Sequence, residues 1–217
     1  MPSFVYFKIV YHNTRSLNKH FADLKSFDLL SGAHLIAVAE SRLLPSDSDA
    51  DFSLPGYSIL RNDQAPSSHI RPSHGSLVYC HDLLQLSDFH TFSSDTCEYI
   101  LLHLPFRAMP LQIVFVYISP SCPANSFQAF VEDIHHHLNS TLPFVLMGDT
   151  NLDIHSPQNT SKIKFLENTL HCKQLMMLPT TDNNSVLDHI YSNMGNIPAG
   201  ILDSYWSDHK FIYTFFN

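Results

Sequence analysis

Short apolar segments alternate with polar turns along most of the chain. The apolar segments are continuous rather than alternating, and they are rich in β-branched and aromatic residues, which is typical of strands covered on both faces. The predicted strands are Val5–Tyr11, His34–Ala39, Tyr57–Arg61, Ser76–Cys80, Tyr99–Leu104, Leu111–Ile118, Pro143–Met147, Val186–Tyr191 and Lys210–Phe216. The pattern therefore predicts a domain of many strands and few helices.

Apolar residues at near-helical spacing predict three helices between these strands. They span Asn18–Leu30, Asn125–Leu138 and Ser161–Leu170. Gly32 follows the first helix as a C-terminal cap would. Asn125 stands three residues before Gln128, which predicts an N-terminal cap on the second helix.

The chain shows no internal repeat and no linker. The polar stretches Pro45–Asp51 and Ala65–Ser73 are predicted to be loops within one domain, because 217 residues suit a single domain. Strands with few helices predict two stacked sheets flanked by helices, an α/β architecture. We therefore expect residues 1–217 to form one domain.

Composition limits the function classes. Hydrophobic residues make up 44% of the chain, which excludes a disordered protein. No apolar run approaches the roughly 20 residues of a membrane helix, and the N-terminus lacks a signal-peptide pattern. The four cysteines are widely spaced, as in an intracellular protein with reduced thiols. A net charge of −8 argues against tight unassisted nucleic-acid binding, but it allows an enzyme that reaches a phosphate through a metal ion.

Polar side chains recur where predicted strands end. Strand ends of a packed sheet gather at one rim, where functional side chains are usual, and carboxylates there are costly unless a cation or a reaction needs them. These candidate residues are Asn13, Glu40, Tyr117, Asp149, Asn151, Asp188, Asp208 and His209.

The residue types suit hydrolysis of a phosphate ester. Mg²⁺ prefers carboxylate and amide oxygens, which Glu40, Asn13 and Asp208 offer. Such an ion stabilises charge on phosphorus and on the departing oxygen.

The remaining candidates suit proton transfer. Asp149 is a candidate general base, and Asn151 lies two residues on, where its side chain would orient the same water. His209 supported by Asp188 is a candidate donor to a phosphoryl oxygen.

Six motifs follow one another in a fixed order over nearly the whole chain. They lie at residues Asn13–Leu17, Ala39–Leu43, Val116–Pro120, Gly148–Asn151, Leu187–Ile190 and Ser207–His209. Each alone is weak, but together they resemble the endonuclease/exonuclease/phosphatase superfamily. The chain most resembles the apurinic-like endonuclease domain of CR1- and L2-type non-LTR retrotransposons or of Helitron-type transposons.

This resemblance implies a four-layered α/β sandwich of two mostly antiparallel sheets. It also implies a Mg²⁺- or Mn²⁺-dependent DNA endonuclease that nicks one strand and leaves 3′-hydroxyl and 5′-phosphate ends for integration of a mobile element. The expected partners are target DNA and other domains of a longer polyprotein, a reverse transcriptase or a helicase, with no membrane. Its site of action would be nuclear.

The resemblance also assigns roles to residues. Glu40 resembles the principal metal ligand, and Tyr117 the tyrosine near the scissile phosphate. It implies contacts with the nucleic acid for Arg61, Asp63, Thr180 and Ser207. Two departures stand out. Arg15 occupies a position that is acidic in apurinic endonucleases, which argues against repair of abasic sites, and His74 precedes a strand where paired glycines are common.

Two alternative functions stay open. The same fold would serve a phosphatase or phosphodiesterase acting on inositol phosphates or lipids. In the second alternative, the domain is a catalytically dead module that binds DNA or protein. The net negative charge favours this alternative over an active nuclease. The histidine triplet 135–137 invites a zinc site, but its place on the predicted helix favours a solvated face.

Overall fold

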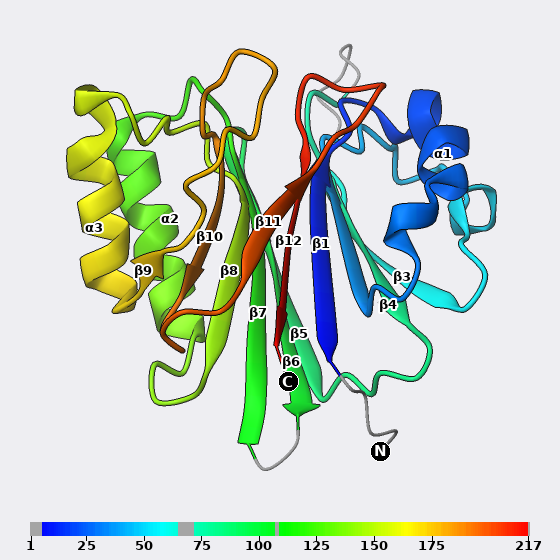
Figure 1. Ribbon diagram of the computed structural model, residues 1–217, viewed down its shortest axis with the longest axis horizontal. Coiled ribbons are helices and arrows are strands. Elements are labelled where there is room, and N and C mark those ends of the chain that lie inside the picture. The colour runs from blue at the N-terminus through cyan, green and yellow to red at the C-terminus, as the bar shows by residue number, and fades with distance from the viewer. Residues whose placement is uncertain (1–5, 65–71, 107–108, 217) are drawn as a thin grey trace.

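The computed structural model describes residues 6–64, 72–106 and 109–216. Within these residues, two six-stranded sheets pack face to face, and α-helices cover their outer faces (Figure 1). Val5 and most of the predicted loop 65–73 lie outside the described residues. The predicted four-layered α/β sandwich is confirmed.

The first sheet has the strand order β11-β12-β1-β2-β4-β3. Its strands are β1 (Phe7–Asn13), β2 (Leu35–Ala39), β3 (Tyr57–Asn62), β4 (Ser76–His81), β11 (Ala199–Leu202) and β12 (Phe211–Phe216). β1 pairs with β2 in parallel, and the other neighbours pair antiparallel.

The second sheet has the order β5-β6-β7-β8-β10-β9. Its strands are β5 (Asp88–Ser93), β6 (Cys97–Phe106), β7 (Met109–Ile118), β8 (Phe144–Asp149), β9 (Lys173–Gln174) and β10 (Asp188–Ser192). Here β7 and β8 form the parallel pair. Both sheets are therefore mostly antiparallel, as predicted.

A helical crossover joins each parallel pair. Helix α1 (Leu17–Ser26) follows β1 and leads to β2, and helix α2 (Ala124–His137) follows β7 and leads to β8. A parallel crossover returns the chain in the same direction, so both carboxyl ends of a pair lie at the same edge of the sheet. This edge, at the top of Figure 1, carries the candidate site.

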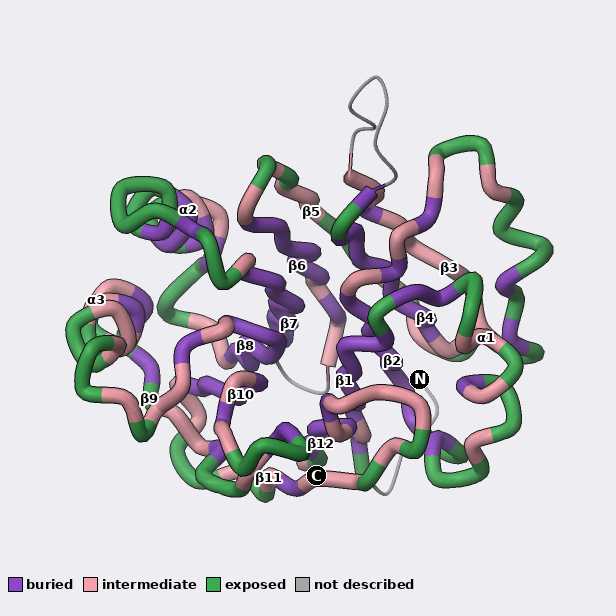
Figure 2. The backbone as a smooth tube through the Cα atoms, turned by 90° about the horizontal axis from the view of Figure 1, so that it is seen from above, coloured by how far each residue is buried: buried purple, intermediate pink, exposed green. Residues whose placement is uncertain are grey.

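The main core lies between the two sheets. Alternate residues of β1 that face the other sheet are Phe7, Ile9 and Tyr11, all buried. On the outer faces, α2 and α3 (Thr160–Leu170) bury Phe130 and Leu166 against the second sheet. In Figure 2, which looks from above, the buried segments gather in the central strands and the exposed ones in the loops and outer helices.

Some predicted boundaries were wrong. Helix α1 ends at Ser26, and a short 3₁₀ turn at Asp28–Leu30 replaces the rest of the predicted helix, so Gly32 does not cap it. Helix α2 begins at Ala124 after Pro123 and has no side-chain cap, so Asn125 is not the cap. Strands β5, β9 and β11 were missed.

The four cysteines are free and buried. No helix among the described residues is long and apolar enough to span a lipid bilayer.

Candidate active site

Inward-facing positions change from apolar to polar at one end of the sandwich. On β1, Tyr11 is followed two residues later by Asn13, and on β8, Met147 is followed by Asp149. Residues two apart on a strand face the same side. These polar side chains therefore point between the two sheets, at the carboxyl ends of the parallel pairs.

Asn13 connects the two sheets. Its amide Nδ2 donates to Glu40 Oε1 at 3.0 Å and to Asp149 Oδ2 at 2.9 Å. The hydroxyl of Tyr117 donates to Glu40 Oε1 at 3.3 Å. Asn13 and Asp149 are fully buried, and the Glu40 side chain is 12% exposed. Four residues from four separate strand ends thus form one hydrogen-bonded group.

A histidine and two aspartates complete the group. His209 Nδ1 lies 2.9 Å from Asp188 Oδ2, and its Nε2 lies 3.9 Å from Asp149 Oδ2. In the register of the second sheet, Asp188 is directly opposite Asp149. The carboxylate and imidazole ligand atoms of these three buried residues lie within 4.8 Å of one another.

This proximity perturbs the ionisation of the group. Burial and the negative charge of Asp188 raise the pKa of Asp149 to about 7, against the opposing effects of His209 and Asn13. Burial alone would lower the pKa of His209, but the charge and hydrogen bond of Asp188, followed by Asp149, raise it to about 10. At neutral pH the imidazole is therefore protonated between two carboxyl groups.

Neighbouring residues fix the positions of this group. Gly148 is required beside Asp149, because a Cβ there would lie 1.9 Å from the carbonyl oxygen of Val116. Asn151 donates its backbone N–H to Asp149 Oδ1 at 3.0 Å, and its side chain donates to the carbonyl of Ile118 at 2.9 Å. The side chain of Asn151 is therefore turned to the backbone.

Backbone strain is concentrated at the same rim. Left-handed φ angles occur at Arg15 (54°), Glu40 (47°), Arg42 (53°) and Asn151 (51°). Each costs roughly 1–2 kcal/mol for a residue with a Cβ. Such conformations persist where the surrounding contacts over-determine them, which is characteristic of functional sites.

Two arginines lie at the mouth of the site. Arg15 Nη2 is 2.8 Å from Asp208 Oδ2, and the Arg15 side chain is 52% exposed. Arg42 pairs with Glu40. Both guanidinium groups thus neutralise carboxylates predicted to bind metal, in a protein whose net charge is −8.

The other predicted residues lie around this centre. Ser207 donates its hydroxyl to the carbonyl of Asn13 at 2.8 Å and accepts from the backbone N–H of His209 at 3.2 Å. Thr180 is fully buried, and its hydroxyl accepts the backbone N–H of Asp188 at 3.0 Å. Thr180 therefore contacts the segment that holds Asp188.

Arg61 and Asp63 pair with each other. Arg61 binds Asp63 Oδ2 at 2.7 Å and Asp49 Oδ1 at 2.9 Å, and it donates to the carbonyl of Leu44 at 2.6 Å. The Arg61 side chain is 12% exposed. The Arg61 guanidinium group therefore holds the loop that precedes β3 through these hydrogen bonds.

The sequence did not reveal three residues of the site. The hydroxyl of Tyr11 accepts the backbone N–H of Asp149 at 2.9 Å and donates to Val116 at 3.1 Å. His74 stacks on Tyr117, and Glu98 binds His74. No local sequence pattern predicts these long-range contacts. The one signal in the sequence is Glu98, a charged residue within an otherwise mostly apolar strand.

A second cluster lies on the outer side of the second sheet. His90, Asp133 and His137 offer ligand atoms within 4.8 Å of one another. The two imidazoles, however, stack with centroids 3.9 Å apart and an interplanar angle of 15°. In two parallel, stacked imidazole rings, the nitrogen lone pairs lie in the two ring planes and do not converge on one metal ion. Residues 135 and 136 are exposed, and His137 is half-buried.

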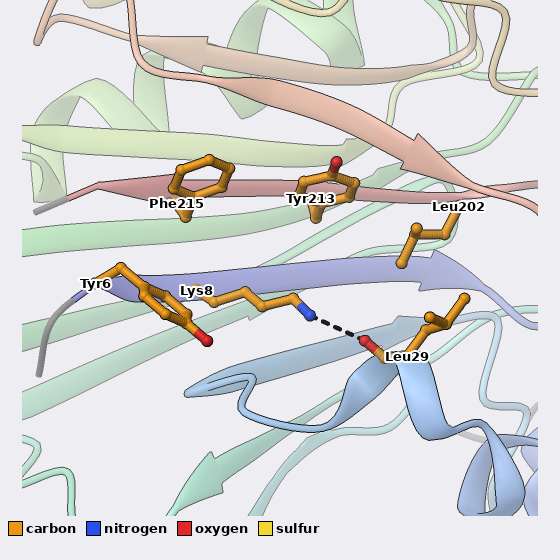
Figure 3. A pocket seen from close by; sticks show the side chains of 6 residues that line it. All are labelled: Tyr6, Lys8, Leu29, Leu202, Tyr213 and Phe215. Atoms are coloured by element: carbon orange, nitrogen blue, oxygen red, sulfur yellow. Dashed lines mark hydrogen bonds between the residues drawn. The ribbon is translucent and has the colours of Figure 1, made fainter.

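An apolar pocket of about 390 Å³ lies at the opposite end of β1 (Figure 3). It is lined by Tyr6, Lys8, Leu29, Leu202, Tyr213 and Phe215. Its polar contact in Figure 3 is the bond from Lys8 Nζ to the carbonyl of Leu29, at 2.9 Å. It contains none of the predicted site residues.

The sandwich and its rim define the endonuclease/exonuclease/phosphatase fold. An endonuclease/exonuclease/phosphatase family protein from Leptotrichia buccalis superposes with a TM-score of 0.73 at 13% identity, over 96% of this chain and 98% of that one. An AP endonuclease from Archaeoglobus fulgidus gives 0.71 at 13%, over 96% and 98%.

The endonuclease domain of TRAS1, a telomere-specific non-LTR retrotransposon, gives 0.70 at 13%, over 97% of each chain. No protein-family model matches the sequence, and no curated protein matches it significantly. The predicted fold resemblance is thus confirmed, with the likeness carried by structure at low sequence identity.

Proposed function

We propose that the protein is a metal-dependent DNA endonuclease that nicks one strand and leaves 3′-hydroxyl and 5′-phosphate ends. The observation that carries this proposal is the placement of Asp149. It lies beside the His209–Asp188 pair and is joined to Glu40 through the Asn13 amide. A general base, an acid and a hard-ligand carboxylate thus converge on one rim.

The residues present fit a hard divalent ion. Asp208 Oδ1 and Asp188 Oδ1 are buried carboxylate oxygens without a hydrogen-bond partner among the described residues. Such an orphan costs roughly 1–3 kcal/mol or more, so a missing partner is indicated. Glu40 and Asp208 would hold Mg²⁺ or Mn²⁺ through carboxylate oxygens. The oxygen of Asn13, the third predicted ligand, accepts the backbone N–H of Arg15 at 3.1 Å, so Asn13 would orient Glu40 instead. The bound ion would stabilise negative charge on the phosphate.

Asp149 acts as the general base in this proposal. Its Oδ1 and Oδ2 are oriented by the Asn151 backbone and the Asn13 amide. A pKa near 7 matches the working pH, which is the favourable condition for proton transfer. Asp149 takes a proton from water, the water oxygen bonds to phosphorus, and the bond from phosphorus to the 3′ oxygen breaks. The departing 3′ oxygen takes a proton from solvent to become the 3′-hydroxyl.

His209 supplies the positive charge. Nδ1 of His209 is held by Asp188, and among the described residues the nearest carboxylate oxygen to its protonated Nε2 is that of Asp149, 3.9 Å away. An N–H donor in a water-poor site stabilises charge that develops on a phosphoryl oxygen. Tyr117, whose pKa is raised by burial and by Glu40, stays a neutral hydroxyl and donates a hydrogen bond at the same rim.

The biological role follows from the resemblance. A TRAS1 retrotransposon endonuclease domain shares the fold, which supports integration of a mobile element as the role. We infer that the substrate is nuclear DNA and that a reverse transcriptase or helicase domain of one polyprotein would use the new 3′-hydroxyl. The exposed Arg15 favours contact with a phosphate at the mouth of the site.

A plasmid assay tests this proposal. Purified protein with Mg²⁺ should convert supercoiled plasmid to open circles, and DNA ligase should reseal them, since ligase needs a 3′-hydroxyl beside a 5′-phosphate. Release of phosphate from inositol polyphosphates without nicking would instead support the phosphatase alternative. Failure of both reactions, with DNA binding retained, would support a dead binding module.

A further inference from the structure

A buried histidine and glutamate lie directly behind Tyr117. The His74 ring stacks on the Tyr117 ring with centroids 5.6 Å apart and an interplanar angle of 26°. His74 is 1% exposed and Glu98 is fully buried. Neither residue belongs to the motifs that carry the family resemblance.

Both carboxylate oxygens of Glu98 accept hydrogen bonds from residues just before β4 and from its first residue. Its Oε2 lies 2.6 Å from His74 Nδ1, and its Oε1 accepts the backbone N–H of Gly75 at 3.1 Å and the hydroxyl of Ser76. Burying a carboxylate costs several kcal/mol unless such bonds compensate it. These contacts therefore hold the His74 ring in one orientation.

The pair also connects the two sheets. His74 precedes β4 of the first sheet, whereas Glu98 lies on β6 of the second, opposite Tyr117 in the register. Gly75 accepts the backbone N–H of Ser41, the residue after Glu40, at 2.8 Å. The same short segment thus contacts the neighbours of both Tyr117 and Glu40.

We propose that His74 and Glu98 form a positioning pair that fixes Tyr117 against Glu40 across the sheet interface. This inference rests on the proposed nuclease function. The Tyr117–Glu40 bond, at 3.3 Å, joins residues from different sheets. Without the stacked ring, Tyr117 is free to tilt away from that carboxylate. Burial alone would lower the pKa of His74, but the hydrogen bond and charge of Glu98 raise it above its usual value.

A double-mutant cycle tests the pair. His74→Ala should lower the nicking rate constant about ten- to a hundred-fold, the usual range for a residue that supports a metal or catalytic site, with DNA affinity nearly unchanged. In a Tyr117→Phe background, where the bond to Glu40 is already lost, the same change should add almost nothing. His74→Gln, which can bind Glu98 but has no ring, should behave like alanine.

His34→Ala is the matched control. His34 is also buried and stacks on Phe7, with centroids 5.0 Å apart, at the end of the first sheet away from the site. It should nick like the wild type.

A measurement without turnover separates this inference from the nuclease function. The Tyr117 signal in ¹³Cζ-tyrosine NMR, assigned by Tyr117→Phe, should shift in His74→Ala but not in His34→Ala. An unmoved signal, or equal rate losses with and without Tyr117, would overturn the pair. A wild type that neither nicks nor releases phosphate would refute the function and leave the NMR result to judge the geometry.

Discussion

The two ends of strand β1 differ in what they bury. At one end, an apolar pocket of about 390 Å³ is lined partly by Tyr6 and Phe215, which are exposed to solvent. At the other end, Asn13 joins buried carboxylates in a crowded, strained rim. The pocket end is lined mostly by apolar side chains, whereas the rim buries the carboxylates of Asp149 and Asp188 beside His209.

The difference teaches which observation identifies a site. Apolar side chains exposed at the surface are normal in folded proteins and do not by themselves indicate a site. Among the described residues, Asp188 and Asp208 each have a buried carboxylate oxygen without a hydrogen-bond partner, and Glu40 has a left-handed backbone; each of these features costs stability. A fold retains such costs where the reaction requires them, so the predictions below contrast the two ends.

Asp149→Asn should have the largest effect. Removal of the proposed general base should reduce the rate constant of nicking by about 10²–10⁴-fold. The amide removes the repulsion with Asp188, but both Asp149 oxygens accept N–H donors, so the buried NH2 group loses one of these hydrogen bonds, which should cost about 1–3 kcal/mol in thermal unfolding. A variant that nicks normally would remove Asp149 from the mechanism.

Asp188→Asn should alter the pH profile. In the wild type, activity should rise as Asp149 deprotonates through about pH 7 and fall as His209 deprotonates through about pH 10. Asp188 raises both pKa values, so both limbs should move to lower pH in the variant. Single-turnover rates from pH 5 to pH 10.5 measure this shift. Unmoved limbs would show that Asp188 does not act on this pair.

The sequence predicted the layered architecture and the polar residues at the strand ends, because both depend on short-range patterns of apolar and polar residues. The inner face of β7 changes from Phe115 to Tyr117, and this is visible in the sequence. Edge strands such as β5 were missed, since a half-exposed strand lacks a continuous apolar run. The pairing of His74 with Glu98, 24 residues apart, depends on how two sheets stack, which no local pattern encodes.

The proposed roles of Glu40 and Asp208 as ligands predict a moderate effect of Mg²⁺ on stability. Mg²⁺ at about ten times its dissociation constant adds about 1.4 kcal/mol to the folded state, which raises the melting temperature by roughly 3–6 °C. Glu40→Gln should lose this increase in differential scanning fluorimetry. Equal increases in the wild type and the variant would place the ion elsewhere.

Substitutions in the pocket should have the smallest effect. Phe215→Ser and Leu29→Ser change side chains that are 38% and 52% exposed, so stability should change by less than about 1 kcal/mol. The nicking rate should stay within about two-fold of the wild type. A large loss of nicking would show that the pocket end contributes to the reaction.

Anomalous diffraction from crystals soaked with Mn²⁺ tests the central claim most directly. We predict a peak at the rim, within bonding distance of the oxygens of Glu40 and Asp208, and its disappearance in Glu40→Gln. A peak beside the apolar pocket, at His90 and His137, or at no ordered position would contradict the assignment of the rim as the catalytic centre.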